Sequence, residues 1–158
     1  MKTYKVKLVS QANSIALIFT MLIIFFSLAY YFFPLKTSTF ISYLLVASLM
    51  VIVYFLWQKF VTGRTEWTID EKNVSMKWIK QFAFTKNPDL NIKWTEIKSI
   101  SRGPDPRYDT LKIKLISGER IKFYHDTLTT KDDYMEFEKV LYQFFNKRKV
   151  NERGNEFN

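Results

Sequence analysis

The chain offers few residues with the chemistry of an active site. His125 and Asp126 are adjacent and could form a general base pair, but no activated serine or cysteine nucleophile motif accompanies them. There is no cysteine, which excludes a disulfide framework and a cysteine-ligated metal, and four glycines leave little material for a phosphate-binding loop. We therefore expect no enzyme, no catalytic or metal-binding residue, and no cofactor.

A basic surface is the stronger candidate for a functional site. Lysines occupy outward positions of predicted strands, at Lys77, Lys93, Lys98, Lys112, Lys114 and Lys122. Near a membrane, such lysines gain about 1 kcal/mol each from anionic lipid headgroups. A solvated sheet face and a contact with a protein partner are the alternatives, and both stay open. Nucleic acid is not expected, because no platform of aromatic residues interleaves with the basic strands.

The charges are distributed unevenly along the 158 residues. All 15 acidic residues lie at or after Glu66, and the formal net charge of +9 divides into +5 for residues 1–63 and +4 for residues 64–158. The first 63 residues carry only five lysines, Lys2, Lys5, Lys7, Lys36 and Lys59. This division predicts one part suited to lipid and one part suited to water.

Two apolar stretches in the first part predict a transmembrane hairpin. Residues 15–33 and 39–57 each contain 19 residues without a charge, which as helices span about 28 Å, close to the hydrocarbon thickness of a bilayer. Only Pro34 to Ser38 separate them, so the helices must be antiparallel neighbours. Both are apolar around the whole circumference, which is not typical of a helix that faces water.

The flanking charges predict the orientation of the hairpin. Lys2, Lys5 and Lys7 precede it and Lys59 and Arg64 follow it, whereas its turn carries Lys36 alone. Because basic flanks stay in the cytoplasm, we expect a multi-pass protein of the cell (inner) membrane with both termini cytoplasmic.

From residue 64 the apolar pattern changes to the two-residue period of β-strands. Trp67 and Ile69 precede a turn at 70–73, after which Val74 and Met76 alternate with polar residues. A further short strand is expected within 80–91. A second hairpin turns at Ser117-Gly118, with Leu111, Ile113 and Leu115 before the turn and Ile121 and Phe123 after it. Trp67 and Trp94 are expected in the core.

The period returns to 3.6 residues between about Lys131 and Lys149. Tyr134, Phe137, Leu141, Phe144 and Phe145 then lie on one side of an amphipathic helix. Thr129 or Thr130 is the expected N-cap, and Asp132 and Asp133 are expected in the first turn. Residues 151–158 are polar and are expected to be disordered.

These segments resemble the bacterial PH-like (pleckstrin-homology-like) domains that follow paired membrane helices. The resemblance covers residues 64–149 and is carried by Glu66 to Asp70, Val74 to Lys77, Ile92 to Ile100, the lysine-rich hairpin and the final helix. Those families often have proline where Lys93 stands. The resemblance implies an α+β membrane protein, with a transmembrane hairpin in 1–63 and, in 64–150, a bent antiparallel barrel that its C-terminal helix closes at one end.

Two classes of function fit this organisation. The first is a non-enzymatic, membrane-anchored binding module that presents its PH-like domain at the cytoplasmic face to a protein, a peptide or a lipid headgroup. The second is a structural or regulatory accessory subunit of a larger membrane complex. In either class the chain is integral to the membrane, and a protein partner or a homo-oligomer is expected.

Overall fold

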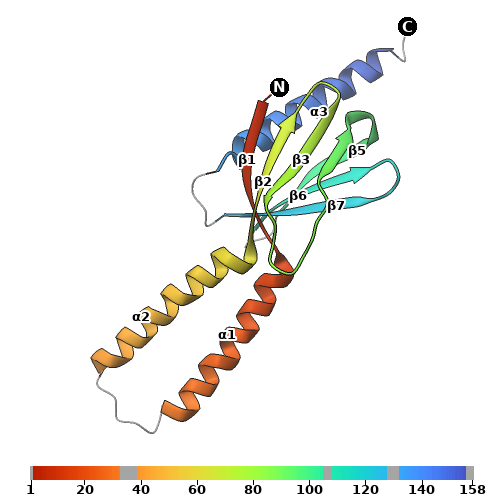
Figure 1. Cartoon of the computed structure of the whole chain (residues 1–158). Coiled ribbons are helices and arrows are strands. Elements are labelled where there is room, and N and C mark those ends of the chain that lie inside the picture. Colours follow the sequence, from red (N-terminus) through yellow and green to blue (C-terminus); the bar gives the residue numbers. More distant parts are fainter. Residues whose placement is uncertain (1, 33–38, 105–107, 128–131, 156–158) are drawn as a thin grey trace. The chain divides into compact units, whose positions relative to one another are not determined.

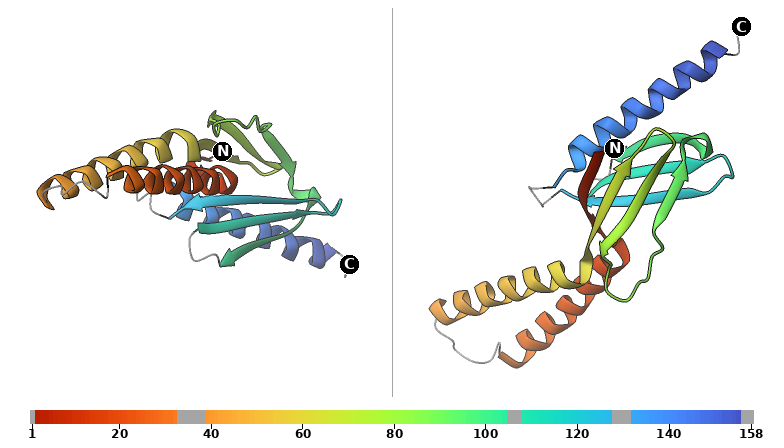
Figure 2. Two further views of the ribbon diagram at one scale, coloured as in Figure 1. Left: turned by 90° about the horizontal axis from the view of Figure 1, so that it is seen from below. Right: turned by 45° about the horizontal axis from the view of Figure 1, so that its top comes forward.

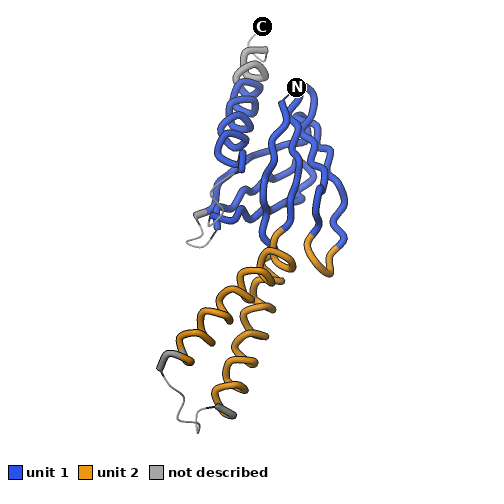
Figure 3. Tube along the Cα trace, turned by 60° about the vertical axis from the view of Figure 1, so that its left-hand side comes forward, with its two compact units in different colours: residues 1–9, 63–81, 86–158 blue, residues 10–62, 82–85 orange. Residues whose placement is uncertain are grey.

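The computed structural model of the chain describes residues 2–32, 39–104, 108–127 and 132–155 (Figure 1). It confirms the α+β class, with two apolar helices near the N-terminus, a seven-stranded sheet and a C-terminal helix. The chain forms two compact units (Figure 3). Unit 1 comprises Met1–Val9, Gly63–Gln81 and Lys86–Asn158, and unit 2 comprises Ser10–Thr62 and Phe82–Thr85.

Unit 1 is built on a single sheet with the strand order β4-β3-β2-β1-β7-β6-β5. Figures 1 and 2 show β6 and β7 running across the direction of β2 and β3, so the sheet is strongly bent. The strands are β1 (Lys2–Val9), β2 (Thr62–Ile69), β3 (Asn73–Lys80), β4 (Leu90–Lys93), β5 (Ile97–Pro104), β6 (Tyr108–Leu115) and β7 (Arg120–Asp126).

The first strand corrects the predicted domain boundary at residue 64. β1 lies between β2 and β7 in the sheet, and its side chains Tyr4, Val6 and Leu8 are at most 2% exposed. These residues alternate with Lys5 and Lys7, which the sequence interpretation had taken only as basic membrane flanks. Residues 64–150 therefore lack one central strand of their own sheet, and the apolar hairpin is an insertion between two adjacent strands.

The two predicted β-hairpins are confirmed. β2 pairs with β3 from Ile69 opposite Val74, and β6 pairs with β7 from Lys114 opposite Arg120. The predicted short strand within 80–91 is displaced: β3 itself extends to Lys80, and β4 begins only at Leu90. A short 3-10 helix, η2 (Trp94–Glu96), follows β4, and the Glu96 carboxylate accepts the Lys93 backbone N–H at 3.1 Å.

The helix α3 (Tyr134–Asn155) covers one face of the sheet, here called the inner face (Figure 2). Trp67 of β2 is 1% exposed, with its ring centroid 4.7 Å from Phe137 of α3 and 4.9 Å from Phe123 of β7. Leu141 and Phe145 complete the buried side of α3, and Trp94 is also buried as predicted. Burial of this apolar area, at about 25 cal/mol per Å², is the main stabilising term of unit 1.

Several details of α3 differ from the sequence interpretation. The helix begins after Asp132 and Asp133, and it continues to Asn155, into the tail that was expected to be disordered. Phe144 is only half-buried, because its ring stacks on Trp94 at the edge of the core. The expected N-cap residues Thr129 and Thr130 and the last residues, 156–158, lie outside the described residues.

Unit 2 contains the apolar hairpin. α1 (Gln11–Phe32) and α2 (Thr39–Leu56) match the predicted spans, except that α1 begins four residues earlier; residues 33–38, including the predicted turn, lie outside the described ranges. A π-helical turn, η1 (Trp57–Val61), continues α2. The Ser10 N–H donates to the Val61 carbonyl at 3.0 Å, so the two ends of the hairpin are joined where the chain enters and leaves the sheet.

Candidate functional sites

The six predicted lysines do not form one surface. Lys112 and Lys114 of β6 lie opposite Lys122 and Arg120 of β7, so four cations gather on the outer face, which α3 does not cover. Lys77 and Lys93 lie on β3 and β4, and two strands, β2 and β1, separate β3 from β7 in the sheet order. Lys98, in the irregular start of β5, belongs to a different feature, an open cavity.

This cavity lies between the start of β5 and the second half of α3 and has a volume of about 350 Å³. Its apolar walls are Trp94, Ile97, Ile116 and Phe145, and its basic groups are Lys98, Arg148 and Lys149. Ile116 is 67% exposed although it is a large apolar residue. A concave, apolar site with a few charged groups is typical of a ligand pocket, and here all the charges of the lining are positive.

Local contacts hold the cavity walls in place. The Trp94 indole N–H donates to the Asp70 carbonyl at 2.8 Å, and the Arg148 guanidinium donates to the Glu71 carbonyl. The Lys149 ammonium lies 5.0 Å from the centroid of the Phe145 ring. The cavity joins residues about 50 positions apart in the sequence, so only Lys98 among its basic groups had been singled out, and no local pattern marked the rest.

A second basic feature crosses three neighbouring strands. Arg64 of β2 lies directly opposite Lys80 of β3, and Lys7 of β1 is close enough to both to interact electrostatically. We call Lys7, Arg64 and Lys80 the basic row. Like charges opposite each other repel, and Asp126 is an acidic group that offsets part of this repulsion at Lys7.

The protonation behaviour of the basic row agrees with its crowding. Burial lowers the pKa of the Lys7 ammonium against the opposing attraction of Asp126, and the nearby Arg64 lowers it further. Burial also lowers the pKa of Lys80, and Arg64 and Lys7 add to this effect. Lys7 and Arg64 had been recognised as membrane flanks, but their alignment with Lys80 depends on strand register, which the sequence does not show.

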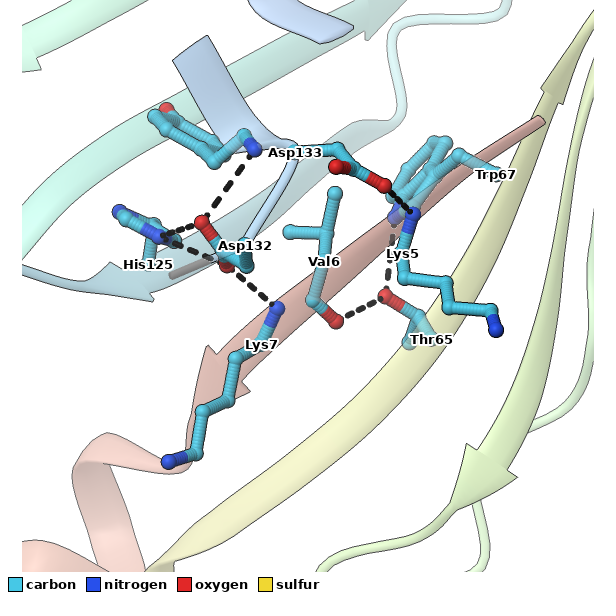
Figure 4. A network of polar contacts seen from close by, with 9 residues as sticks. Lys5, Val6, Lys7, Thr65, Trp67, His125, Asp132 and Asp133 are labelled. Atoms are coloured by element: carbon cyan, nitrogen blue, oxygen red, sulfur yellow. Dashed lines mark hydrogen bonds and ion pairs between the residues drawn. The ribbon is translucent and has the colours of Figure 1, made fainter. Parts of the chain in front are cut away.

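His125 and Asp126 are adjacent in the sequence, but the carboxylate that contacts the His125 imidazole is that of Asp132. His125 Nε2 instead lies 3.0 Å and 3.1 Å from the two carboxylate oxygens of Asp132, which precedes α3 (Figure 4). The imidazole is 6% exposed and stacks on the Tyr134 ring at a centroid distance of 3.9 Å. The imidazole is thus held between Asp132, which precedes α3, and Tyr134, the first residue of α3.

Asp132 and Asp133 accept hydrogen bonds from the backbone of β1. β1 pairs with β7 where Leu8 lies opposite His125. Nearer the N-terminus of β1, its backbone lies beside the segment that precedes α3 (Figure 4). There the Lys7 N–H donates to Asp132 and the Lys5 N–H donates to Asp133, both at 2.8 Å. Burial alone would raise the pKa of Asp132, but the hydrogen bonds from His125 and from Lys7 outweigh it and lower that pKa.

A further cluster of charged side chains connects the edge strand β5 with β6 and α3. The Arg102 guanidinium contacts Asp109 at 2.5 Å and Glu138 of α3 at 3.7 Å. Burial, and then the charge of Glu138, raise the pKa of the Tyr134 phenol. Within the described ranges, no cluster of three or more His, Asp or Glu residues is arranged to hold a metal ion.

Comparison with known proteins adds no relative. No family model matches the chain, no curated protein matches it, and no solved structure matches it. The function must therefore be argued from the geometry of the two units.

Proposed function

We propose that the chain is a non-enzymatic, membrane-anchored binding module, with the hairpin in the cell (inner) membrane and the sheet unit at its cytoplasmic face. One observation carries the proposal: an apolar helical hairpin interrupts the sheet between the adjacent strands β1 and β2. Two windows, Gln11–Tyr30 and Tyr43–Val61, are long and apolar enough to cross a membrane, and only 6% of each is buried.

The exposed surface of the hairpin is apolar, which supports contact with lipid rather than with water. Large apolar side chains such as Ile23, Phe26 and Met50 are between 66% and 68% exposed. Contiguous apolar surface on this scale is rare on soluble monomers. Thr20 and Ser48 donate to the carbonyls of Ala16 and Leu44 in their own helices, which satisfies these hydroxyls without water.

The sheet unit is the binding part of the proposed module. A bent antiparallel sheet with one C-terminal helix against it supports the PH-like interpretation. The cavity beside Lys98 is the proposed ligand site, and its lining suits a partner that combines an anionic group with an apolar part. Lys98 and Lys149 meet the anion, and Trp94, Ile116 and Phe145 meet the apolar part.

Anionic lipid headgroups are a second proposed partner, and the basic row is better placed for them than Lys112, Lys114 and Lys122. Lys7 lies four residues before Gln11, where α1 begins, and Arg64 lies three residues after Val61, where η1 ends. At no more than about 3.6 Å per residue, the chain keeps both within about 15 Å of the proposed membrane helices.

Replacement of the hairpin tests the anchor. Because Ser10 and Val61 are hydrogen-bonded, a short glycine-rich turn in place of residues 11–60 keeps both partners and should join β1 to β2 without strain. The intact chain should remain in membranes washed at alkaline pH, and the replaced chain should be soluble and folded. Release of the intact chain by the wash would refute the membrane anchor.

Charge reversal separates the proposed binding sites. A partner captured from solubilised membranes should be retained by Lys77→Glu and lost by Lys98→Glu. The soluble, hairpin-replaced chain should sediment with phosphatidylglycerol vesicles at low salt, and Lys80→Glu should weaken that binding more than the triple change of Lys112, Lys114 and Lys122 to Glu. Equal loss of the partner in Lys77→Glu and Lys98→Glu would contradict the ligand site beside Lys98. Equal vesicle binding in Lys80→Glu and the triple variant would contradict the role of the basic row.

The alternative function is an accessory subunit of a larger membrane complex. An accessory subunit would co-purify in detergent with a stoichiometric integral partner through the hairpin. A binding module would carry no stoichiometric integral partner through the hairpin, and the partner that its sheet unit captures would be lost on Lys98→Glu.

A further inference from the structure

The loop after β3 is part of unit 2. Residues Phe82–Thr85 group with the hairpin, although the strands on either side of the loop belong to unit 1. The Asn13 side-chain amide donates both to the Phe60 carbonyl, at 2.9 Å, and to the Ala83 carbonyl, at 2.8 Å. One side chain at the start of α1 thus fixes the loop to the end of the hairpin where both helices meet the sheet.

Phe84, at the tip of this loop, combines a strained backbone with a ring that is exposed to water. Its φ of 67° lies in the left-handed region, the only such value for a non-glycine among the described residues, and bulky side chains avoid this region. Its side chain is also 91% exposed, more than any other large apolar side chain that the structure describes. A strained backbone that presents an aromatic ring outward indicates a surrounding that rewards the exposure.

The neighbours of Phe84 indicate what that surrounding is. Its ring stacks on Phe60 of η1, with centroids 5.8 Å apart and planes 3° from parallel. The Lys59 ammonium lies 5.5 Å from the centroid of the Phe60 ring. Aromatic rings with a lysine at the end of an apolar helix are the composition found at the boundary between hydrocarbon and headgroups.

We propose that Phe84, held against Phe60, is a membrane-interface anchor that inserts its ring among the phospholipids at the cytoplasmic boundary. This inference rests on the proposed membrane anchor and adds a third point of contact, from the β3–β4 loop, to the two helices. Phospholipid is favoured over a protein partner because the ring extends from the same end of the hairpin that carries Lys59 and Phe60.

Spin labelling can test the insertion, because the chain has no cysteine of its own. Full-length Phe84→Cys carries a nitroxide label in liposomes of phosphatidylcholine and phosphatidylglycerol. Collision with dissolved oxygen, which concentrates in lipid, is compared with collision with a water-soluble nickel chelate. Ile23→Cys, in the middle of α1, is the control for lipid, and Ser117→Cys, in the exposed β6–β7 turn, is the control for water.

The label at position 84 should have an oxygen-to-nickel ratio clearly above that of Ser117→Cys and below that of Ile23→Cys. Phe84→Cys removes the ring and can disturb the loop, so Thr85→Cys, which keeps the Phe84 ring in place, is the second variant. It should give a similar intermediate ratio. A ratio at both positions equal to that of Ser117→Cys would overturn the interface anchor but not the membrane anchor. Shielding from both reagents would replace lipid with a protein contact, and nickel access at Ile23→Cys would overturn the membrane anchor itself.

Discussion

Single aromatic side chains of α3 hold the sheet unit together. Phe137 is fully buried, and its ring lies 5.8 Å from that of Tyr4 and 4.7 Å from that of Trp67. We expect Phe137→Ala to cost about 3–5 kcal/mol, which is comparable to the whole stability of a small domain. Thermal unfolding followed by near-ultraviolet circular dichroism measures this loss.

Met135 provides the matched control on the same helix. Its side chain is 66% exposed, so Met135→Ala should leave the melting temperature almost unchanged. Comparable losses in the two variants would mean that α3 does not pack on the sheet through Phe137.

Asp132 links the stability of the sheet unit to acid. Its pKa in the folded chain lies below its ordinary value of 3.8, so the ionised carboxylate favours the folded state. That contribution is fully present above pH 4 and is lost as the pH falls through the folded pKa. Asp132→Asn should therefore be less stable at pH 7, and its stability should fall less between pH 5 and pH 2.

Denaturant midpoints across this pH range test the acid linkage. Glu119→Gln, in the exposed β6–β7 turn, is the control and should keep the pH dependence of the unaltered chain. An unchanged pH dependence in Asp132→Asn would assign the acid response to other carboxylates.

The burial of single residues could be predicted where the apolar period of one strand or helix determines which side chains face the core. Trp67, Trp94, Phe137 and Leu141 were expected in the core and are buried. Phe144 and Phe145 were both expected on the apolar side of the helix, but only Phe145 is buried and Phe144 is half-buried. Their positions are about 100° apart on the helix, so the bend of the sheet decides which one is covered. The cavity and the basic row could not be predicted, since each depends on how distant segments align.

At the scale of elements, β1 is the strand on which the sheet depends most. It joins the β2–β4 part to the β5–β7 part, and Lys7 donates its backbone N–H to Asp132. Lys7→Pro removes this donor, and we expect a loss of about 1–3 kcal/mol. Lys7→Thr removes the same side chain but keeps the donor, so only the proline variant should become sensitive to limited proteolysis.

Strands and helices could be predicted where the flanking sequence carries the usual turn residues and the apolar period is clear. The two β-hairpins and the three helices followed from apolar period and turn residues. β1 has the same two-residue period, but three lysines next to an apolar helix favoured a membrane flank. A strand separated from its neighbour by an inserted hairpin has no turn residues to reveal the pairing.

At the scale of the whole molecule, the orientation in the membrane remains a prediction. The basic flanks predict that Ser38, between the helices, lies outside the cell and that the β6–β7 turn lies inside. In intact cells an impermeant thiol reagent should label Ser38→Cys and should label Ser117→Cys only after the cells are lysed. Labelling in the opposite order would reverse the proposed topology.

The inserted hairpin also sets the order in which the protein can be made. β1 leaves the ribosome first, but its partner Asp133 follows 128 residues after Lys5. At about 5–20 residues per second, that delay is roughly 6–26 seconds. During this interval β1 can pair with β2, its other neighbour in the sheet, but the edge of β1 that faces β7 and Asp133 stays open. Closure of the sheet along this edge of β1 therefore comes late in folding, and if the hairpin inserts in a membrane as proposed, a failure of insertion would leave that edge open to chaperones and proteases.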